Sequence, residues 1–277
     1  MVKKLTSFLK KNWKVVVIAL VAILAIVLVF VIIRAHKASK IESVTTTTKA
    51  AQTQEPLFNP KTISEGDSTT PYTIKVTYPL FKNINNSAAE AKLNQLLADK
   101  VNEEIVAFKK EVAARKTNTA IPQDFKSYLT IDYKVEYLSN QIASILFNEE
   151  AMLAGDAHPG HKTTTVNYNL EDNKNIVLTD LFAEGSGYLT FLSNNTIKYL
   201  KGLNISNDEM INAGAGPEAK NYANFYITDQ AIVFVFDYYT VAPGVAGVQK
   251  AFFPFPSIKN MLIQDGILKS LLAREII

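Results

Sequence analysis

The sequence predicts an α+β fold, with antiparallel sheets packed against helices and one transmembrane helix in front of them. Three observations support this prediction: a long apolar run near the N-terminus, one long amphipathic helix, and pairs of short apolar segments joined by polar turns. Because these segments come in pairs and do not alternate singly with helices, we expect the strands to form hairpins.

The N-terminal apolar run comprises the nineteen residues from Val15 to Ile33, which carry no charge. At ~1.5 Å per residue, a helix over this run is roughly 28 Å long, which matches the hydrocarbon core of a bilayer. Five lysines precede the run and three basic residues follow it, so the positive-inside rule places residues 1–14 in the cytoplasm as a short tail. The alternative is a cleaved signal peptide, whose apolar stretch is usually only ~7–15 residues long.

Residues 34–70 are rich in Thr, Ser, Lys and Gln and contain few large apolar side chains. Such a segment cannot bury enough apolar surface to offset its ordering entropy, so we expect a flexible stalk. Two α+β subdomains are expected to follow, an N-terminal one over residues 71–150 and a C-terminal one over residues 151–277.

The N-terminal subdomain is predicted to contain strands on either side of a long helix. Residues 73–78 alternate polar and apolar side chains, as a half-buried strand does. Ser87 and Glu90 form a capping-box pattern that begins the helix. Residues 129–137 are apolar at every odd position and are expected to pair with residues 142–147. The apolar stripe of the helix consists of Leu93, Leu97, Val101, Ile105, Phe108 and Val112.

The C-terminal subdomain is predicted to combine further strands with shorter helices. Ile232–Phe236 is apolar on both faces, which is typical of a central strand covered on both sides. Gly202 is expected to stop one helix, and Ser206 with Glu209 to begin the next. The expected strands are 163–170, 224–228 paired with 231–236, and 250–255, and the expected helices are 186–200, a short one after Ser206, and 267–276.

Composition excludes several classes of function. The chain has no cysteine, so it forms neither disulfides nor thiolate metal sites. Eight of the 29 Lys and Arg residues lie within residues 1–40, which leaves 21 basic against 26 acidic residues in the remainder. A net charge of about −5 there does not favour nucleic-acid binding.

The first candidate site is the loop from Gly155 to His161. The spacing of His158 and His161 could present two imidazoles to one metal ion, with Asp156 as a third ligand. The alternative is a tight loop, turned by Pro159, whose histidines face solvent or bond the backbone. No further ligand is apparent outside the N-terminal region, so neither a metal nor another cofactor is predicted.

A carboxylate pair drawn from Glu149, Glu150 and Asp237 could support glycoside chemistry, but such pairs arise by chance among 26 acidic residues. The sequence has no nucleophile elbow, P-loop or dinucleotide fingerprint. We therefore expect the protein not to be an enzyme.

The second candidate site is the loop that begins with Tyr238 and Tyr239 and reaches Pro243 and Gly244. Tyrosines on a rigid loop offer a large contact area to a protein or glycan at a low entropic cost. The alternative is that one tyrosine packs in the core and the other covers it.

Several short segments, taken in order, resemble a known module. Their order and spacing are similar to those of the extracytoplasmic module of RsiV-type anti-sigma factors and PdaC-type peptidoglycan deacetylases, and residues 72–150 resemble the smaller domain that precedes it. The segments are Asp156–Pro159, Thr165–Leu170, Leu178–Phe182, Asn224–Asp229 and Tyr239–Gly244.

The resemblance implies a membrane-anchored bacterial ectodomain. In RsiV-type proteins this region binds lysozyme, and in PdaC-type enzymes it accompanies a separate catalytic domain. The predicted inner tail is too short for a sigma-binding segment, and no deacetylase domain is expected after Ile277. A further departure is Gly155-Asp156, where the family tends to have two glycines.

Together these observations predict a non-catalytic, single-pass membrane protein that binds a lysozyme-like protein or a cell-wall ligand outside the membrane. The alternatives are a cell-wall-modifying hydrolase or deacetylase accessory protein, and a receptor that signals through its basic tail. The oligomeric state stays open. The expected ligand-binding residues are His158, Pro159, His161, Tyr238, Tyr239 and Pro243.

Overall fold

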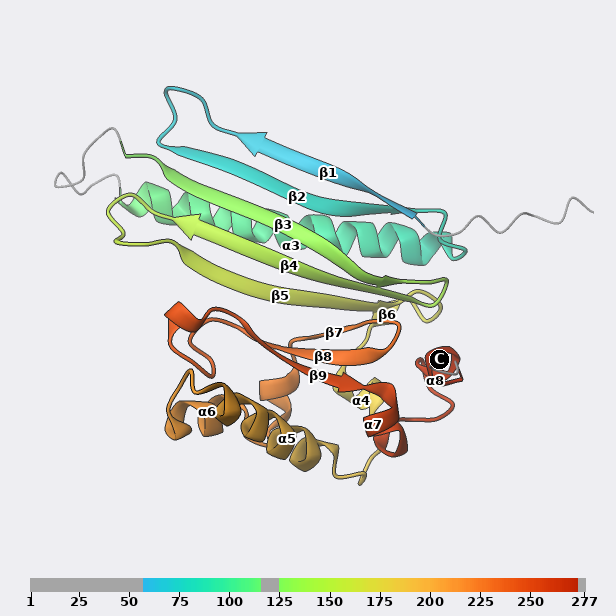
Figure 1. Ribbon diagram of the computed structural model, residues 1–277. Coiled ribbons are helices and arrows are strands. Elements are labelled where there is room, and N and C mark those ends of the chain that lie inside the picture. The colour runs from blue at the N-terminus through green and yellow to red at the C-terminus, as the bar shows by residue number, and fades with distance from the viewer. Residues whose placement is uncertain (1–56, 116–124, 274–277) are drawn as a thin grey trace, which may run out of the picture. The chain divides into compact units, whose positions relative to one another are not determined.

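The computed structural model describes residues 57–115 and 125–273 (Figure 1). The predicted tail, the predicted transmembrane helix and most of the predicted stalk lie outside these residues. Within the described ranges, no helix is both long enough and apolar enough to cross a membrane.

A six-stranded sheet forms the first layer of the fold. Its strands follow one another in chain order from β1 to β6, and all neighbours are antiparallel except β2 and β3. The parallel pair is connected through the long helix α3 (Ser87–Arg115). The strands are β1 (Leu57–Glu65), β2 (Tyr72–Lys82), β3 (Ser127–Leu138), β4 (Ile142–Met152), β5 (Gly160–Asn169) and β6 (Lys174–Asn175).

Helix α3 packs along one face of this sheet (Figure 1). All six residues of its predicted apolar stripe are buried, together with Ala89. The N-terminal cap lies one residue before the predicted one, because the Asn86 side chain accepts a hydrogen bond from the Ala89 N–H at 3.1 Å. The Glu90 side chain does reach back, but it accepts from the Ile84 N–H at 3.0 Å and not from the N–H of the cap residue, as the predicted capping box would require.

A smaller antiparallel sheet contains β7 (Phe225–Ile227), β8 (Ala231–Phe236) and β9 (Gln249–Pro254), with β8 in the middle. All six residues of β8 are buried, which confirms the predicted central strand. Helices α5 (Tyr188–Leu203) and α6 (Asp208–Gly214) belong to this half of the fold. The shorter helical segments are α4 (Leu178–Leu181), η1 (Ala219–Tyr222), η2 (Gly244–Ala246), α7 (Phe255–Ile258), η3 (Lys259–Met261) and α8 (Lys269–Leu272).

Polar side chains join the two sheets and occupy the outer edge of β7. The Phe225 N–H donates to Thr165 Oγ1 at 3.1 Å, and the Phe225 carbonyl accepts from Asn167 Nδ2 at 2.6 Å. The Ile227 N–H donates to Ser144 Oγ at 2.8 Å, and that hydroxyl donates to Asn167 Oδ1 at 2.6 Å. The N–H and C=O of Phe225 and the N–H of Ile227 are thus paired, although no strand of the described residues extends the sheet at this edge.

The structure corrects the predicted strand pairing and the predicted start of ordered structure. The larger sheet is mixed, because the long crossover through α3 brings β3 parallel to β2. Residues 57–65 of the predicted stalk form β1, since pairing with β2 satisfies their backbone without burying much apolar surface. The predicted boundary at residue 150 falls inside β4, which pairs with β5, so one sheet extends across it.

Three helix limits also differ from prediction. Helix α5 continues through Gly202 to Leu203, and Asn204 caps it in the left-handed conformation at φ 54°. Asn207, and not Ser206, caps α6 by accepting from the Met210 N–H at 2.8 Å. The predicted helix over 267–276 is shorter, with α8 covering four residues within the described range.

Candidate functional site

The two predicted loops meet at one cavity of about 300 Å³. One side comes from the start of β5 and the loop before it, and the other from the loop between β8 and β9. Five of the six predicted residues line the cavity; Pro243 does not, and instead immediately precedes η2. The lining residues are His158, Pro159, Gly160, His161, Tyr238, Tyr239, Gly244 and Val245.

The His161 and Tyr238 rings connect the two sides of the cavity. They stack with their centroids 4.7 Å apart and their planes 17° apart. Tyr238 is held in place through Asp237, whose Oδ1 accepts from the N–H groups of Tyr238 at 2.9 Å and Thr163 at 3.0 Å. One carboxylate therefore fixes the tyrosine loop to the edge of β5.

Tyr239 covers the adjacent backbone and stays open to solvent. Its backbone is left-handed, with φ 61°, and 62% of the residue is exposed. A Cβ placed on Gly244 would lie 2.3 Å from Tyr239 Cζ, so only glycine allows the ring to rest there. Val245 beside it is 98% exposed. The rim of the cavity is therefore apolar, aromatic and accessible.

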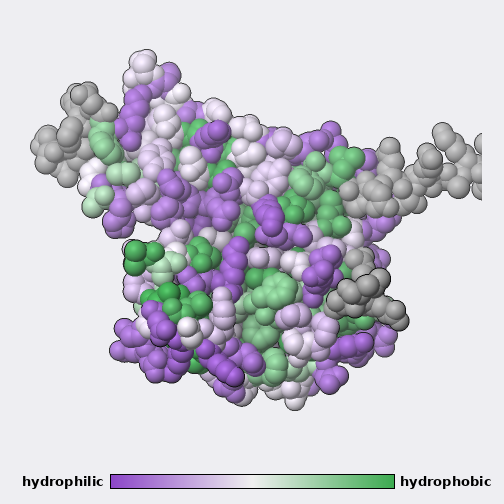
Figure 2. Space-filling view, viewed as in Figure 1, coloured by the Kyte–Doolittle hydropathy of each residue, from purple (hydrophilic) through white to green (hydrophobic). Residues whose placement is uncertain are grey.

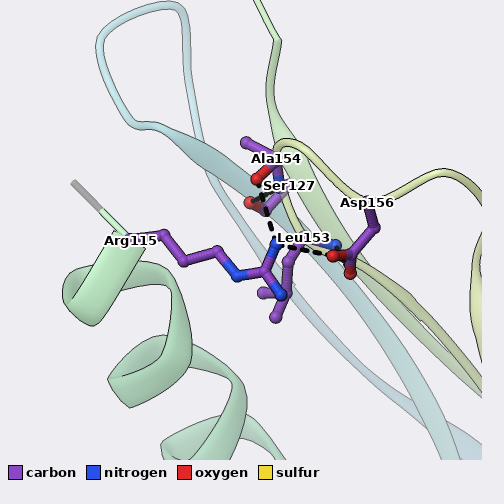
Figure 3. A network of polar contacts seen from close by, with 5 residues as sticks. All are labelled: Arg115, Ser127, Leu153, Ala154 and Asp156. Carbon is purple, nitrogen blue, oxygen red and sulfur yellow. Dashed lines mark hydrogen bonds and ion pairs between the residues drawn. The ribbon is translucent and has the colours of Figure 1, made fainter. Parts of the chain in front are cut away.

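A polar network anchors the histidine loop to the end of α3 (Figure 3). Arg115 Nη1 donates to Asp156 Oδ1 at 2.5 Å and to the Ala154 carbonyl at 3.3 Å. The Ala154 N–H donates to Ser127 Oγ at 2.9 Å, and the other oxygen of Asp156 accepts from the Leu153 N–H at 3.4 Å. Asp156, the residue that departs from the family pattern, is thus part of the support of the loop.

This network weakens the metal hypothesis for the loop. His158 and His161 both line the cavity, but the carboxylate of Asp156 is bonded to Arg115 and to the backbone. Among residues 57–115 and 125–273, no three His, Cys, Asp or Glu side chains are grouped to hold a metal ion.

Of the three candidate carboxylates, Glu150 and Asp237 accept hydrogen bonds, whereas Glu149 is near enough to Asp237 to be influenced by its charge. Glu150 accepts from the Tyr128 hydroxyl at 2.6 Å and lies 3.6 Å from His161 Nδ1. Burial raises the pKa of Glu149, and the charges of Glu104 and Asp237 add to the increase. Burial also raises the pKa of Asp237, although its two backbone hydrogen bonds act against this.

Sequence reasoning missed three contributors to the site. Neither Arg115 nor Val245 was singled out. Gly244 was seen only as a turn residue. The first two carry no local signal, because their roles depend on contacts with segments distant in sequence. A glycine shortly after two adjacent tyrosines is a weak signal for the third.

Comparisons with known proteins match two protein families to different parts of the chain. Residues 65–161 match the family described as Deacetylase PdaC, and residues 179–256 match a protein family of unknown function, DUF3298. The chain is 28% identical over 193 residues to the peptidoglycan-N-acetylmuramic acid deacetylase PdaC of Bacillus subtilis strain 168. That match covers 69% of this chain and 38% of the relative.

Two crystal structures share the fold. A DUF3298 family member from Bacteroides fragilis NCTC 9343 has a TM-score of 0.60 at 18% identity, and covers 79% of this chain and 98% of its own. A DUF3298 family protein from Pseudomonas aeruginosa PAO1 has a TM-score of 0.52 at 14% identity, with 75% and 94% covered. At these identities the likeness concerns the fold alone. Together with the family matches, it supports a module of the PdaC/DUF3298 type.

Proposed function

We propose that this PdaC/DUF3298-type module is a non-catalytic, extracytoplasmic binding domain for a lysozyme-like protein or a cell-wall glycan. The match to a protein named as a peptidoglycan deacetylase supports a place at the cell wall, although the matched region spans 38% of that protein. The apolar run over residues 15–33 would anchor the domain to the membrane, with residues 1–14 in the cytoplasm.

The cavity between the two loops is the observation that carries this proposal. Its rim presents Tyr239 and Val245 to solvent, and its walls are fixed by the His161–Tyr238 stack. Rigid, exposed aromatic groups lose little entropy on binding and are common anchors of interfaces. Each loop is held from behind by a carboxylate, so the cavity is formed before a ligand arrives.

An accessory role in wall hydrolysis or deacetylation is the second candidate. It is favoured by one contact, the 3.6 Å approach of Glu150 to His161 at the cavity wall. A carboxylate beside an imidazole is a common arrangement for general base chemistry.

Binding to the full-length chain, purified in detergent, tests the proposal. Lysozyme and soluble peptidoglycan fragments would be titrated separately against the immobilised protein. We expect Tyr239→Ala to weaken binding by about tenfold, as truncating an interface anchor does. Phe125→Ala is the matched control, because Phe125 is an aromatic residue that is 45% exposed and lines neither this cavity nor the one beside α5.

Two outcomes would contradict the binding role. One is that neither ligand binds, and the other is that Phe125→Ala weakens binding as much as Tyr239→Ala does. Release of acetate or of reducing sugar by the purified chain, abolished in His161→Ala, would instead support the enzymatic candidate.

A further inference from the structure

Strand β9 is an open edge of the smaller sheet. Its register pairs Ala251 with Phe234 and Phe253 with Ile232, and the Phe255 N–H donates to the Gln230 carbonyl at 2.9 Å. Bonded pairs alternate along an antiparallel ladder, so the N–H and C=O groups of the intervening residues, Lys250 and Phe252, point away from β8. No group within the described ranges bonds them.

The two edge strands of this sheet, β7 and β9, differ in whether their outward backbone groups are hydrogen-bonded. At β7 the outward N–H and C=O of Phe225 and the outward N–H of Ile227 bond side chains of the larger sheet. At β9, Pro254 removes one donor, but Lys250 and Phe252 keep all four outward groups. An edge left with free donors and acceptors can receive another strand.

A cavity of about 300 Å³ lies beside the open edge, between β9 and α5. Phe191 and Tyr199 of α5 line one side, and Phe252 of β9 lines the other. Phe252 is 57% exposed and Tyr199 is 50% exposed. Figure 2 shows hydrophobic residues gathered on the surface where β9 and α5 lie, and Figure 1 shows β9 as the outermost strand of its sheet.

We infer that β9 is a docking site for an extended peptide segment of a partner protein, which adds to the sheet as an antiparallel strand. Every pair in this sheet is antiparallel, so the added strand continues the pattern. Free backbone groups repeated along the strand match the main chain of a peptide, whereas a glycan has no such repeat. Strand β1 is also at an edge, but it does not line this cavity.

The groove also specifies the side chains of the peptide. Lys250 is the one charged residue that lines the cavity among the described residues, so an acidic residue is expected opposite it. Phe252 lies on the same face of β9 as Lys250 and favours an apolar residue opposite. The residue between these two points towards Phe191 and Tyr199 on α5 and is also expected to be apolar. Read from its N-terminus, the peptide therefore carries apolar, apolar, acidic.

A synthetic peptide tests this inference on the full-length protein. The probe is a fluorescent Thr-Thr-Leu-Val-Glu-Thr-Thr, with the reversed sequence as a control of equal composition. Fluorescence anisotropy is expected to show saturable binding of the probe and binding at least threefold weaker for the reversed peptide. N-methylation of the Leu and Glu amides, which face β9, is expected to abolish binding, whereas methylation of the Val amide is not.

Protein variants locate the interaction. We expect Lys250→Glu to weaken binding of the probe by about threefold to fivefold. The same variant is expected to bind a peptide with Lys in place of Glu more tightly than the native chain does. Phe252→Ala is expected to weaken the probe by about tenfold. Lys61→Glu, the same charge change on exposed β1, is the control. Both replaced β9 residues are exposed, so the circular dichroism spectrum should not change.

Several results would overturn the inference. They are the absence of probe binding at millimolar concentration, equal effects of Lys61→Glu and Lys250→Glu, and equal binding of the two methylated peptides. Concentration-dependent dimerisation that Phe252→Ala removes would assign the edge to a second copy of the chain. Competition by a peptidoglycan oligosaccharide would assign the groove to a glycan. Binding at the cavity of Tyr239 does not depend on any of these outcomes.

Discussion

Replacement of Asn167 by alanine should remove a hydrogen bond between the two sheets and lower the free energy of unfolding. Asn167 is 6% exposed, donates to the Phe225 carbonyl at 2.6 Å and accepts from the Ser144 hydroxyl at 2.6 Å. The substitution leaves two buried polar groups without these partners, and each such group costs about 1–3 kcal/mol. Because Ser144 still accepts from the Ile227 N–H, we expect a total loss of about 3 kcal/mol in the free energy of unfolding.

Equilibrium unfolding in urea, followed by far-ultraviolet circular dichroism of the full-length chain, measures this loss. Asn195→Ala is the matched control, since the Asn195 amide is exposed and donates to Phe191 on the same helix. We expect the control to change stability by less than about 0.5 kcal/mol. A double-mutant cycle with Ser144→Ala should give a coupling energy of about 1 kcal/mol or more. A loss for Asn167→Ala below about 1 kcal/mol, or no coupling to Ser144, would refute the reasoning.

Three further predictions concern the loops of the site. Burial raises the pKa of Asp237, so the Asp237 carboxyl keeps its proton to a higher pH in the folded state than in the unfolded state. The contribution of Asp237 to the free energy of unfolding therefore falls as the pH rises from 3.8 through the folded pKa. Asp237→Asn keeps a side-chain oxygen that can accept the same hydrogen bonds, so the free energy of unfolding of this variant should decrease less over this pH range than that of the native chain. A larger decrease in the variant would contradict the prediction. Gly244→Ala should displace the Tyr239 ring and weaken ligand binding by about tenfold with an unchanged melting temperature, since only an exposed side chain must move. Gly214→Ala should cost about 1–3 kcal/mol in urea unfolding, because the new Cβ would lie 2.1 Å from the Thr240 carbonyl oxygen; a neutral result would show that this backbone can shift.

Periodicity predicted the elements that bury one clear face. The apolar stripe of α3 and the β3–β4 hairpin follow directly from the spacing of apolar residues, because the polarity of each side chain there indicates whether it is buried. Strand β1 escaped prediction because its side chains are largely exposed and only backbone pairing with β2 holds it. The parallel pairing of β2 and β3 was also missed, since a helix of 29 residues gives no sign of where the following strand will lie.

The candidate site was predictable in its residues but not in its support. Unusual composition marks His158, His161 and Tyr239, because histidine, proline and adjacent tyrosines are conspicuous in a loop. The ion pair of Arg115 with Asp156 joins residues 41 positions apart, and no sequence pattern around either residue indicates its partner. The proximity of the two loops likewise follows from tertiary packing, which local sequence does not encode.

The side chains that occupy the β7 edge place an unusual constraint on β5. Valine or isoleucine at position 167 would have a higher strand propensity than Asn167, and at position 165 either would have a propensity like that of Thr165 but no hydroxyl. Such a change would free the outward N–H and C=O of Phe225, and the smaller sheet would then be open on both sides. A sheet with two open edges can pair with other molecules on each side and so grow into chains. The pairing of the β7 edge therefore depends in part on Asn167, a residue that lowers the intrinsic strand preference of β5.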